Sequence, residues 1–133
     1  MPKVRVYSID KKEKYKIIGE LLEIIVSLRS KDEVVGFMIG LLTPSEVLMI
    51  ARRIQIAKML LQDATNEEIR RKLKVSYQTI NKVEHWLKND ENKFSIISEK
   101  IKSIEKNKKS KVGYSKGLLD KYAQHKFIKD LLQ

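Results

Sequence analysis

The sequence lacks cysteine altogether and holds few of the residues that force turns. The absence of cysteine excludes disulfide bonds and thiolate metal sites, and it agrees with a reducing compartment. Only two prolines and five glycines occur among 133 residues. Because a β fold with many strands needs many turns, this scarcity favours an all-α fold.

Long apolar runs are missing as well. No segment approaches the roughly 18 consecutive apolar residues that a membrane-spanning helix needs. Residues 1–14 have no apolar core of the kind found in a secretory signal. We therefore expect a soluble, cytoplasmic protein. Hydrophobic residues at 42% and charged residues at 34% are typical of a chain that folds.

The chain is strongly basic, with 28 lysines and arginines against 17 acidic residues and a net charge of +11. Such an excess is common in proteins that bind nucleic acids or other anionic surfaces. Most of the excess lies in residues 92–133. This tail either adds nonspecific DNA affinity, which weakens as salt rises, or is a solvated surface.

Residue patterns that carry catalysis are absent from the sequence. His85 and His125 are far apart, and His85 cannot share a helix face with the adjacent Glu84. There is no glycine-rich phosphate loop, nucleophile elbow or metal-spaced cluster. The sequence predicts neither an enzyme nor a cofactor or metal site.

Apolar residues recur at helical spacing through the first 62 residues. A first helix is predicted to end near residues 27–33, with one apolar stripe. A short second helix and a third, ending near Gln62, follow. The stripe of the first helix consists of Ile17, Ile18, Leu21, Leu22, Ile25 and Leu28. The residues expected on the buried side are Val34, Phe37, Met38 and Leu41 in the second helix, and Val47, Ile50, Ile54, Ala57, Leu60 and Leu61 in the third.

Three capping boxes mark where helices begin. In each, a Ser or Thr hydroxyl accepts from a backbone N–H three residues on, and a Glu at that position reaches back. Pro44 follows the second cap, at a helical position where its missing N–H costs nothing. The pairs are Ser30 with Glu33, Thr43 with Glu46, and Thr65 with Glu68.

Residues 65–87, TNEEIRRKLKVSYQTINKVEHWL, resemble one amphipathic helix with an interruption. Val75 and Ser76 continue a helix poorly, but Ser76 is a good cap for a new one. The apolar spacing is that of a helix-turn-helix, in which a recognition helix projects away from its supporting helix. The residues expected to pack inward are Ile69, Leu73, Val75, Ile80, Val83, Trp86 and Leu87.

Polar and basic residues occupy the remaining faces of this helix pair. Gln and Asn pair with adenine edges, Thr and Tyr contact thymine methyls or phosphates, and basic residues hold phosphates. Many such turns use Gly where this chain has Lys74, which must then adopt left-handed geometry. Helix pairs of this kind also occur in bundles that never touch DNA. The predicted base-reading residues are Tyr77, Gln78, Thr79, Asn81 and Lys82, and the predicted phosphate contacts are Arg70, Arg71, Lys72, Lys74 and Ser76.

Residues 41–87 resemble the Trp repressor family, and the spacing upstream is similar to that of its YerC/YecD branch. The matching features are the Leu-Leu-Thr-Pro-x-Glu helix start at 41–46, Arg53, Leu60-Leu61, Ile69-x-x-x-Leu73, Thr79-Ile80-x-Lys82 and Leu87. With the helix before residue 31, the resemblance covers about residues 15–91. It implies an interlocked homodimer that reads a palindromic operator, with half-sites about one helical turn (~34 Å) apart. The wide apolar stripe of the first helix agrees with such a dimer.

The resemblance also implies roles for single residues. Arg70 matches a phosphate-contacting position, and Tyr77, Gln78, Thr79 and Asn81 match operator-facing ones. In the effector pocket, Arg53 matches one of two arginines that hold the tryptophan corepressor, Lys82 replaces the other, and Thr43 fits the pocket edge. Trp86 stands where the repressor has a small residue. It either fills the space of a ligand, so that DNA binding needs no tryptophan, or packs at the dimer seam.

The predicted organisation is an N-terminal arm (1–11), a Trp repressor-like helix-turn-helix domain (12–91) and a basic helical extension (92–133). Phe94, Ile97, Ile101 and Ile104 have the seven-residue spacing of a core or dimer-facing helix. A last helix has Leu119, Tyr122, Ile128 and Leu131 as anchors. The sequence predicts a sequence-specific transcriptional regulator, a repressor, that binds double-stranded DNA as a homodimer. The alternative is a basic helical interaction module, antitoxin-like or a scaffold, without specific DNA readout.

Overall fold

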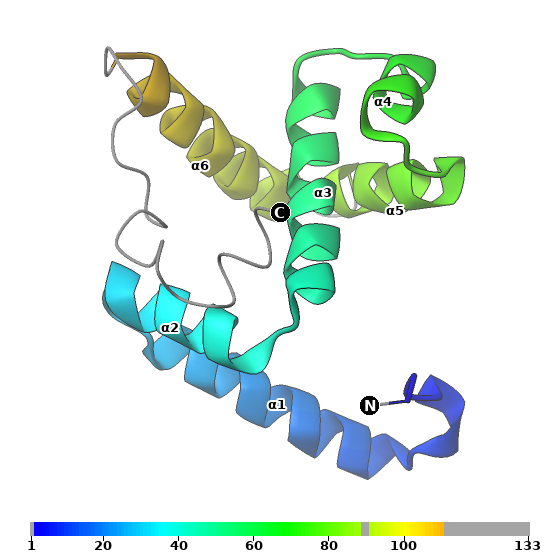
Figure 1. Ribbon diagram of the computed structural model, residues 1–133, viewed down its shortest axis with the longest axis vertical. Helices are drawn as coiled ribbons and strands as arrows, with labels where there is room; N and C mark the ends of the chain where they lie inside the picture. The colour runs from blue at the N-terminus through cyan, green and yellow to red at the C-terminus, as the bar shows by residue number, and fades with distance from the viewer. Residues whose placement is uncertain (1, 89–90, 111–133) are drawn as a thin grey trace. The chain divides into compact units, whose positions relative to one another are not determined.

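The computed structural model describes residues 2–88 and 91–110, and within them the chain is helical without strands (Figure 1). The predicted last helix at 119–131 lies outside the described residues. Contacts divide the chain into two compact units, Met1–Leu41 and Leu42–Gln133. The elements are η1 (Val6–Ser8), α1 (Lys11–Ser27), α2 (Lys31–Leu41), α3 (Pro44–Leu61), α4 (Asn66–Leu73), α5 (Tyr77–Lys88) and α6 (Glu91–Ser110).

Helix starts follow the predicted capping boxes. The Ser30 amide donates to Glu33 Oε2 and the Glu33 amide donates to Ser30 Oγ, both at 3.1 Å. The same reciprocal pair joins Thr43 and Glu46 at the start of α3, where Pro44 takes the first helical position. These local hydrogen bonds satisfy backbone donors that the helix itself leaves open, which explains why the starts could be read from sequence.

The first unit buries very little of its apolar surface within the chain. α1 has no buried residue, and the predicted stripe is exposed, with Ile18 at 53% and Leu22 at 55%. In α2 only Val35 is buried. The prediction that Val34 and Leu41 lie on the buried side is wrong, because they are 45% and 57% exposed. α2 is apolar around most of its circumference, so periodicity could not select a face.

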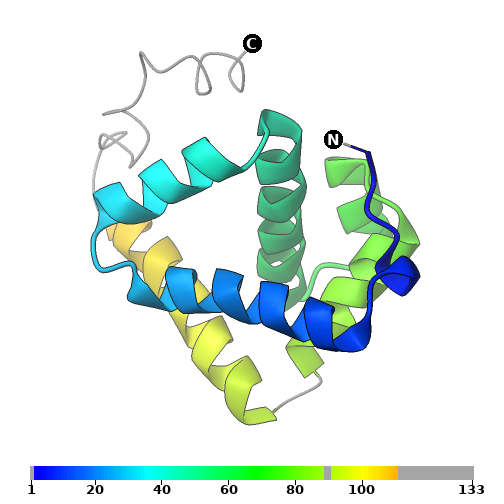
Figure 2. The same ribbon diagram turned by 90° about the horizontal axis from the view of Figure 1, so that it is seen from below.

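The second unit contains the core. α3 contacts α4, α5 and α6, while α5 also contacts α4 and α6. Figures 1 and 2 both place α4 and α6 on opposite sides of α3. The buried cluster comes from three helices and consists of Ile56, Ala57, Ile69, Leu73, Ile80, Val83 and Leu87. Ile101 of α6 packs against it, in agreement with the core alternative for that helix.

Two features of this core differ from the sequence prediction. In α3 the fully buried residues are Ile56 and Ala57. Ala57 was predicted and Ile56 was not, whereas the predicted Ile50 and Ile54 are 44% and 39% exposed. α3 is apolar on more than one face, and the α4–α5 pair covers the face with Ile56 and Ala57. The inward placement of Trp86 is also wrong, because its side chain is 45% exposed.

Candidate nucleic-acid interface

The α4–α5 segment begins with a complete capping box. The Thr65 amide donates to Glu68 Oε2 at 3.0 Å, and the Glu68 amide donates to Thr65 Oγ1 at 3.2 Å. Three basic residues occupy the last turn of α4, where positive charge is favourable beside the carbonyl end of the helix dipole. α4 is therefore a short, well-terminated helix whose C-terminal end carries the positive charge.

The predicted break between the two helices is present. Lys74 has φ 55° and ψ 44°, the left-handed conformation, and its amide donates to the Arg70 carbonyl at 2.9 Å. Ser76 then caps α5, since its Oγ accepts from the Thr79 amide at 3.2 Å. The left-handed residue turns the chain, and the cap starts α5 in a new direction.

One face of each helix packs inward and the other is exposed. Ile69 and Ile80 are fully buried, and Val83 is 3% exposed. On the outer face of α5, Tyr77, Gln78, Asn81 and Lys82 are exposed and Thr79 is half-buried. The Thr79 hydroxyl lies 3.0 Å from Ser76 Oγ, so this residue also takes part in the cap. The five residues therefore lie in the first half of α5, and four of them are on its exposed face.

A shallow hollow of about 650 Å³ adjoins this face at the end of α4 and the turn. Four of the five residues predicted to hold phosphates line it, together with Glu67 and Val75; they are Arg70, Arg71, Lys74 and Ser76. Lys72 is exposed but does not line this hollow. The hollow therefore gathers three positive charges beside the start of α5, where the helix dipole also favours an anion.

A contact between Arg70 and Tyr77 links the two helices. Arg70 Cζ lies over the Tyr77 ring, 5.0 Å from its centroid, within the range of a cation–π interaction. Sequence reasoning gave these residues separate roles and missed their contact. Seven positions separate them across a turn, so only the geometry of that turn brings them together.

Comparison with known proteins identifies the family. The family model described as Trp repressor protein matches residues 16–102, which is more than half of the chain. The chain belongs to the Trp repressor family. It is similar to the "Uncharacterized protein YerC" of Bacillus subtilis (strain 168), with 27% identity over 96 residues, 72% of this chain and 92% of that relative. No solved structure matches the chain.

The Trp repressor family match extends through α3–α5 into α6. It therefore confirms the resemblance inferred from residues 41–87 and covers both helices of the interrupted segment. Within the described residues no helix is long and apolar enough to cross a membrane. In the same part of the chain, no group of three or more His, Cys, Asp or Glu side chains could hold a metal ion.

The residues that the Trp repressor resemblance assigns to an effector pocket do not gather around a described hollow. The three hollows characterised in the described part of the second unit are lined by residues other than Thr43, Arg53, Lys82 and Trp86. Thr43 is engaged in the α3 capping box. Trp86 is 45% exposed. The effector role of these four residues remains a prediction.

Free tryptophan is expected to leave the melting temperature of the protein unchanged. In the filled-pocket hypothesis, which rests on the family resemblance, the indole of Trp86 takes up room that a ligand ring would need, and Lys82 offers a point charge instead of the planar fork of an arginine. The measurement is a thermal-shift titration with tryptophan. As a control, the titration is repeated on Trp86→Ser, which opens the space. Clear stabilisation of the unsubstituted protein would contradict the filled-pocket hypothesis.

Proposed function

We propose that the protein is a sequence-specific DNA-binding transcriptional regulator, acting as a repressor in the cytoplasm. The observation that carries this proposal is the outward row of polar side chains on α5 beside the basic hollow at the end of α4. Membership of the Trp repressor family supports it. A helix that presents amides and hydroxyls outward, with phosphate-binding charge at its start, has the form that enters a major groove.

In this proposal some of the exposed residues contact bases and the others contact phosphates. Gln78 and Asn81 make paired hydrogen bonds to adenine edges, because a side-chain amide has both a donor and an acceptor. Lys82 supplies charge in the groove. Arg71 and Lys74 bind phosphates and set the register of α5 on the duplex. Ser76, which lines the hollow, and Lys72, which lies outside its lining, add further phosphate contacts.

Tyr77 is assigned to holding Arg70 in addition to facing the DNA. Replacing Tyr77 with leucine removes the ring beneath the guanidinium and is expected to weaken operator binding about two- to five-fold. Tyr77→Phe keeps the ring and should retain affinity within about two-fold. Both variants are measured by fluorescence anisotropy on one DNA duplex. Equal losses in the two variants would mean that the hydroxyl, and not the stack, matters.

The proposal includes a homodimer, which two recognition helices on a palindromic operator require. Exposed apolar surface on a single chain is large on α1 and, within the second unit, on the first half of α3. It includes Ile17, Ile18, Leu21, Leu22, Ile24, Ile25 and Val26 in α1, and Leu48, Met49 and Ile50 in α3. Surface of this extent is unusual on a monomer and is typical of an interface.

The molar mass in solution tests the dimer. Since one chain has a mass of 15.6 kDa, light scattering during size exclusion is expected to give about twice that mass. Ile18→Glu together with Leu22→Glu places charge on the stripe and should shift the mass toward one chain. A monomeric unsubstituted protein at micromolar concentration would contradict this part of the proposal.

The experiment that tests DNA binding is a gel shift on the DNA upstream of the protein's own gene and on random DNA, across a salt series. A regulator binds the specific duplex more tightly, and its preference persists as salt rises, whereas nonspecific affinity falls steeply. No binding even at low salt would favour the alternative, a basic helical interaction module. Equal binding to both duplexes would also contradict specific readout.

A further inference from the structure

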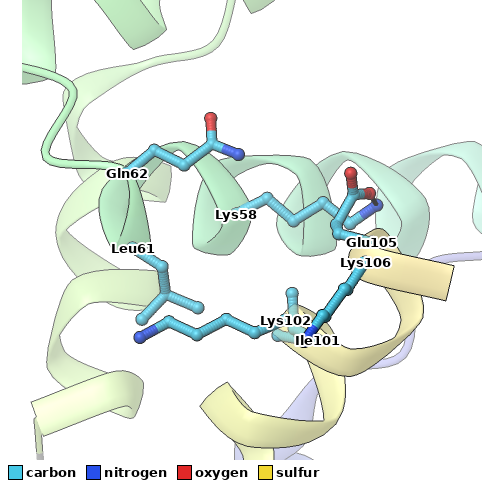
Figure 3. Close-up of a pocket in the computed structure, with 7 residues that line it drawn as sticks. All are labelled: Lys58, Leu61, Gln62, Ile101, Lys102, Glu105 and Lys106. Atoms are coloured by element: carbon cyan, nitrogen blue, oxygen red, sulfur yellow. Dashed lines mark hydrogen bonds and ion pairs between the residues drawn. The ribbon is translucent and has the colours of Figure 1, made fainter. Parts of the chain in front are cut away.

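A second candidate site lies away from the α4–α5 face, between the last turns of α3 and the middle of α6 (Figure 3). The groove has a volume of about 310 Å³, at the lower end of what small-molecule sites occupy. None of its lining residues is among the predicted DNA contacts. Its lining combines an apolar floor with charged groups, which is the composition of a site for a small amphipathic molecule.

Leu61 and Ile101 form the apolar floor. Ile101 packs against the core cluster, so the floor adjoins the buried core of the second unit. In Figure 3 the Lys102 side chain extends beside Leu61, with its ammonium group at the far end of the groove. The Lys102 stem therefore lengthens the apolar floor, and its charge lies at the edge.

The charge of the groove is positive. Lys58 forms an ion pair with Glu105 across the two helices, and this pair leaves Lys58 largely neutralised. Lys102 and Lys106 also line the groove, and neither has an ion-pair partner among the described residues. Gln62 adds a neutral amide donor at the rim. Two uncompensated ammonium groups over an apolar floor favour a negatively charged ligand.

We propose that this groove binds a small organic anion, a carboxylate without an amino group, carried on an aliphatic or aromatic body. The carboxylate lies between the ammonium groups of Lys102 and Lys106, and the body lies over Leu61 and Ile101. An inorganic anion would interact with the two ammonium groups but would make no contact with the apolar floor. An amine with the same body would contact the apolar floor, but its positive charge would be repelled by the two ammonium groups. The proposal does not depend on DNA binding.

Isothermal titration of the full-length protein without DNA tests the site, with octanoate as the probe. Acetate and inorganic phosphate control for charge alone, and octylammonium controls for the apolar body alone. The Lys102→Gln, Lys106→Gln double variant removes the two free charges. The matched control is Lys72→Gln with Lys100→Gln, which removes two exposed lysines that do not line the groove.

Saturable binding of octanoate is expected, with little heat from acetate, phosphate or octylammonium. In the K102Q/K106Q variant affinity should fall about five-fold, while the K72Q/K100Q control stays within about two-fold. Absence of octanoate binding would overturn the proposal, as would equal losses in the two double variants. Equal binding of octylammonium would show that the apolar floor binds any alkyl chain regardless of charge, and it would also overturn the proposal. Because no DNA is present, these outcomes stand whether or not the protein proves to be a regulator.

Discussion

Ile80→Ala is expected to lower the free energy of unfolding by about 2–5 kcal/mol, the largest effect of any single change considered. Ile80 is fully buried and belongs to the cluster that joins α3, α4 and α5. Truncation removes the contacts of the side chain and leaves a cavity that rigid helices fill only in part. Urea unfolding followed by circular dichroism, at one fixed protein concentration, measures the change.

The neighbouring Asn81 supplies the control for Ile80. Asn81 is exposed on the opposite face of the same helix, so Asn81→Ala should change the free energy of unfolding by no more than about 0.5 kcal/mol. If the proposed function holds, the same substitution weakens specific DNA binding. The pair thus separates the packed face of α5 from its exposed face. Similar destabilisation by both substitutions would mean that α5 is not oriented as described.

Removing the charge of the hollow is expected to have the largest effect on DNA binding. Replacing Arg70, Arg71 and Lys74 by alanine takes away three cations that line it. Each lost phosphate contact lowers the salt slope by about 0.9, so the slope should flatten by about 2.7. At about 0.1 M salt this corresponds to a loss of about 500-fold in affinity. Anisotropy titrations at four salt concentrations give both numbers.

A variant of equal net charge serves as the control for this triple variant. Lys100, Lys102 and Lys106 are all exposed on α6, outside the hollow. Their replacement by alanine removes the same three charges but should leave the salt slope nearly unchanged. If both triple variants flatten the slope equally, binding follows the net charge of the chain, and the hollow has no special role.

Helix starts and the break were accessible from the sequence because short-range hydrogen bonds fix them. At the starts of α2, α3, α4 and α5 a side-chain hydroxyl accepts a hydrogen bond from the backbone amide three residues later, so the whole pattern lies within four positions. The accepting residues are Ser30, Thr43, Thr65 and Ser76. The left-handed turn at Lys74 was anticipated for the same reason, since a turn of this kind demands it. Such local hydrogen bonds can be predicted without knowing which distant segments pack together.

The buried faces of the longer helices were harder to predict from the sequence. Ile56 and Ile54 are both isoleucines in one apolar helix, yet Ile56 is buried and Ile54 is 39% exposed. The choice depends on where α4 and α5 pack, which periodicity within α3 does not contain. Trp86 was predicted to face inward, but it is 45% exposed in the described part of the chain.

Site residues divide in the same way. The exposure of Gln78 and Asn81 followed from the positions of Ile80 and Val83, because a helix with one buried face must expose the other. The Lys58–Glu105 ion pair joins residues 47 positions apart, and the groove beside it has no counterpart in any sequence motif. Features formed by two segments that are distant in the sequence could be identified only from the folded structure.

Selection of bound sequences from a random DNA pool tests the central claim most directly, namely that the exposed row of α5 reads bases. The unsubstituted protein is predicted to enrich a palindrome with half-sites about one helical turn apart. The Gln78→Ala, Asn81→Ala variant, which keeps the basic hollow, is predicted to bind the pool but lose preference at the base pairs that those residues contact. An unenriched pool with the unsubstituted protein, or the same palindrome with the variant, would contradict the account.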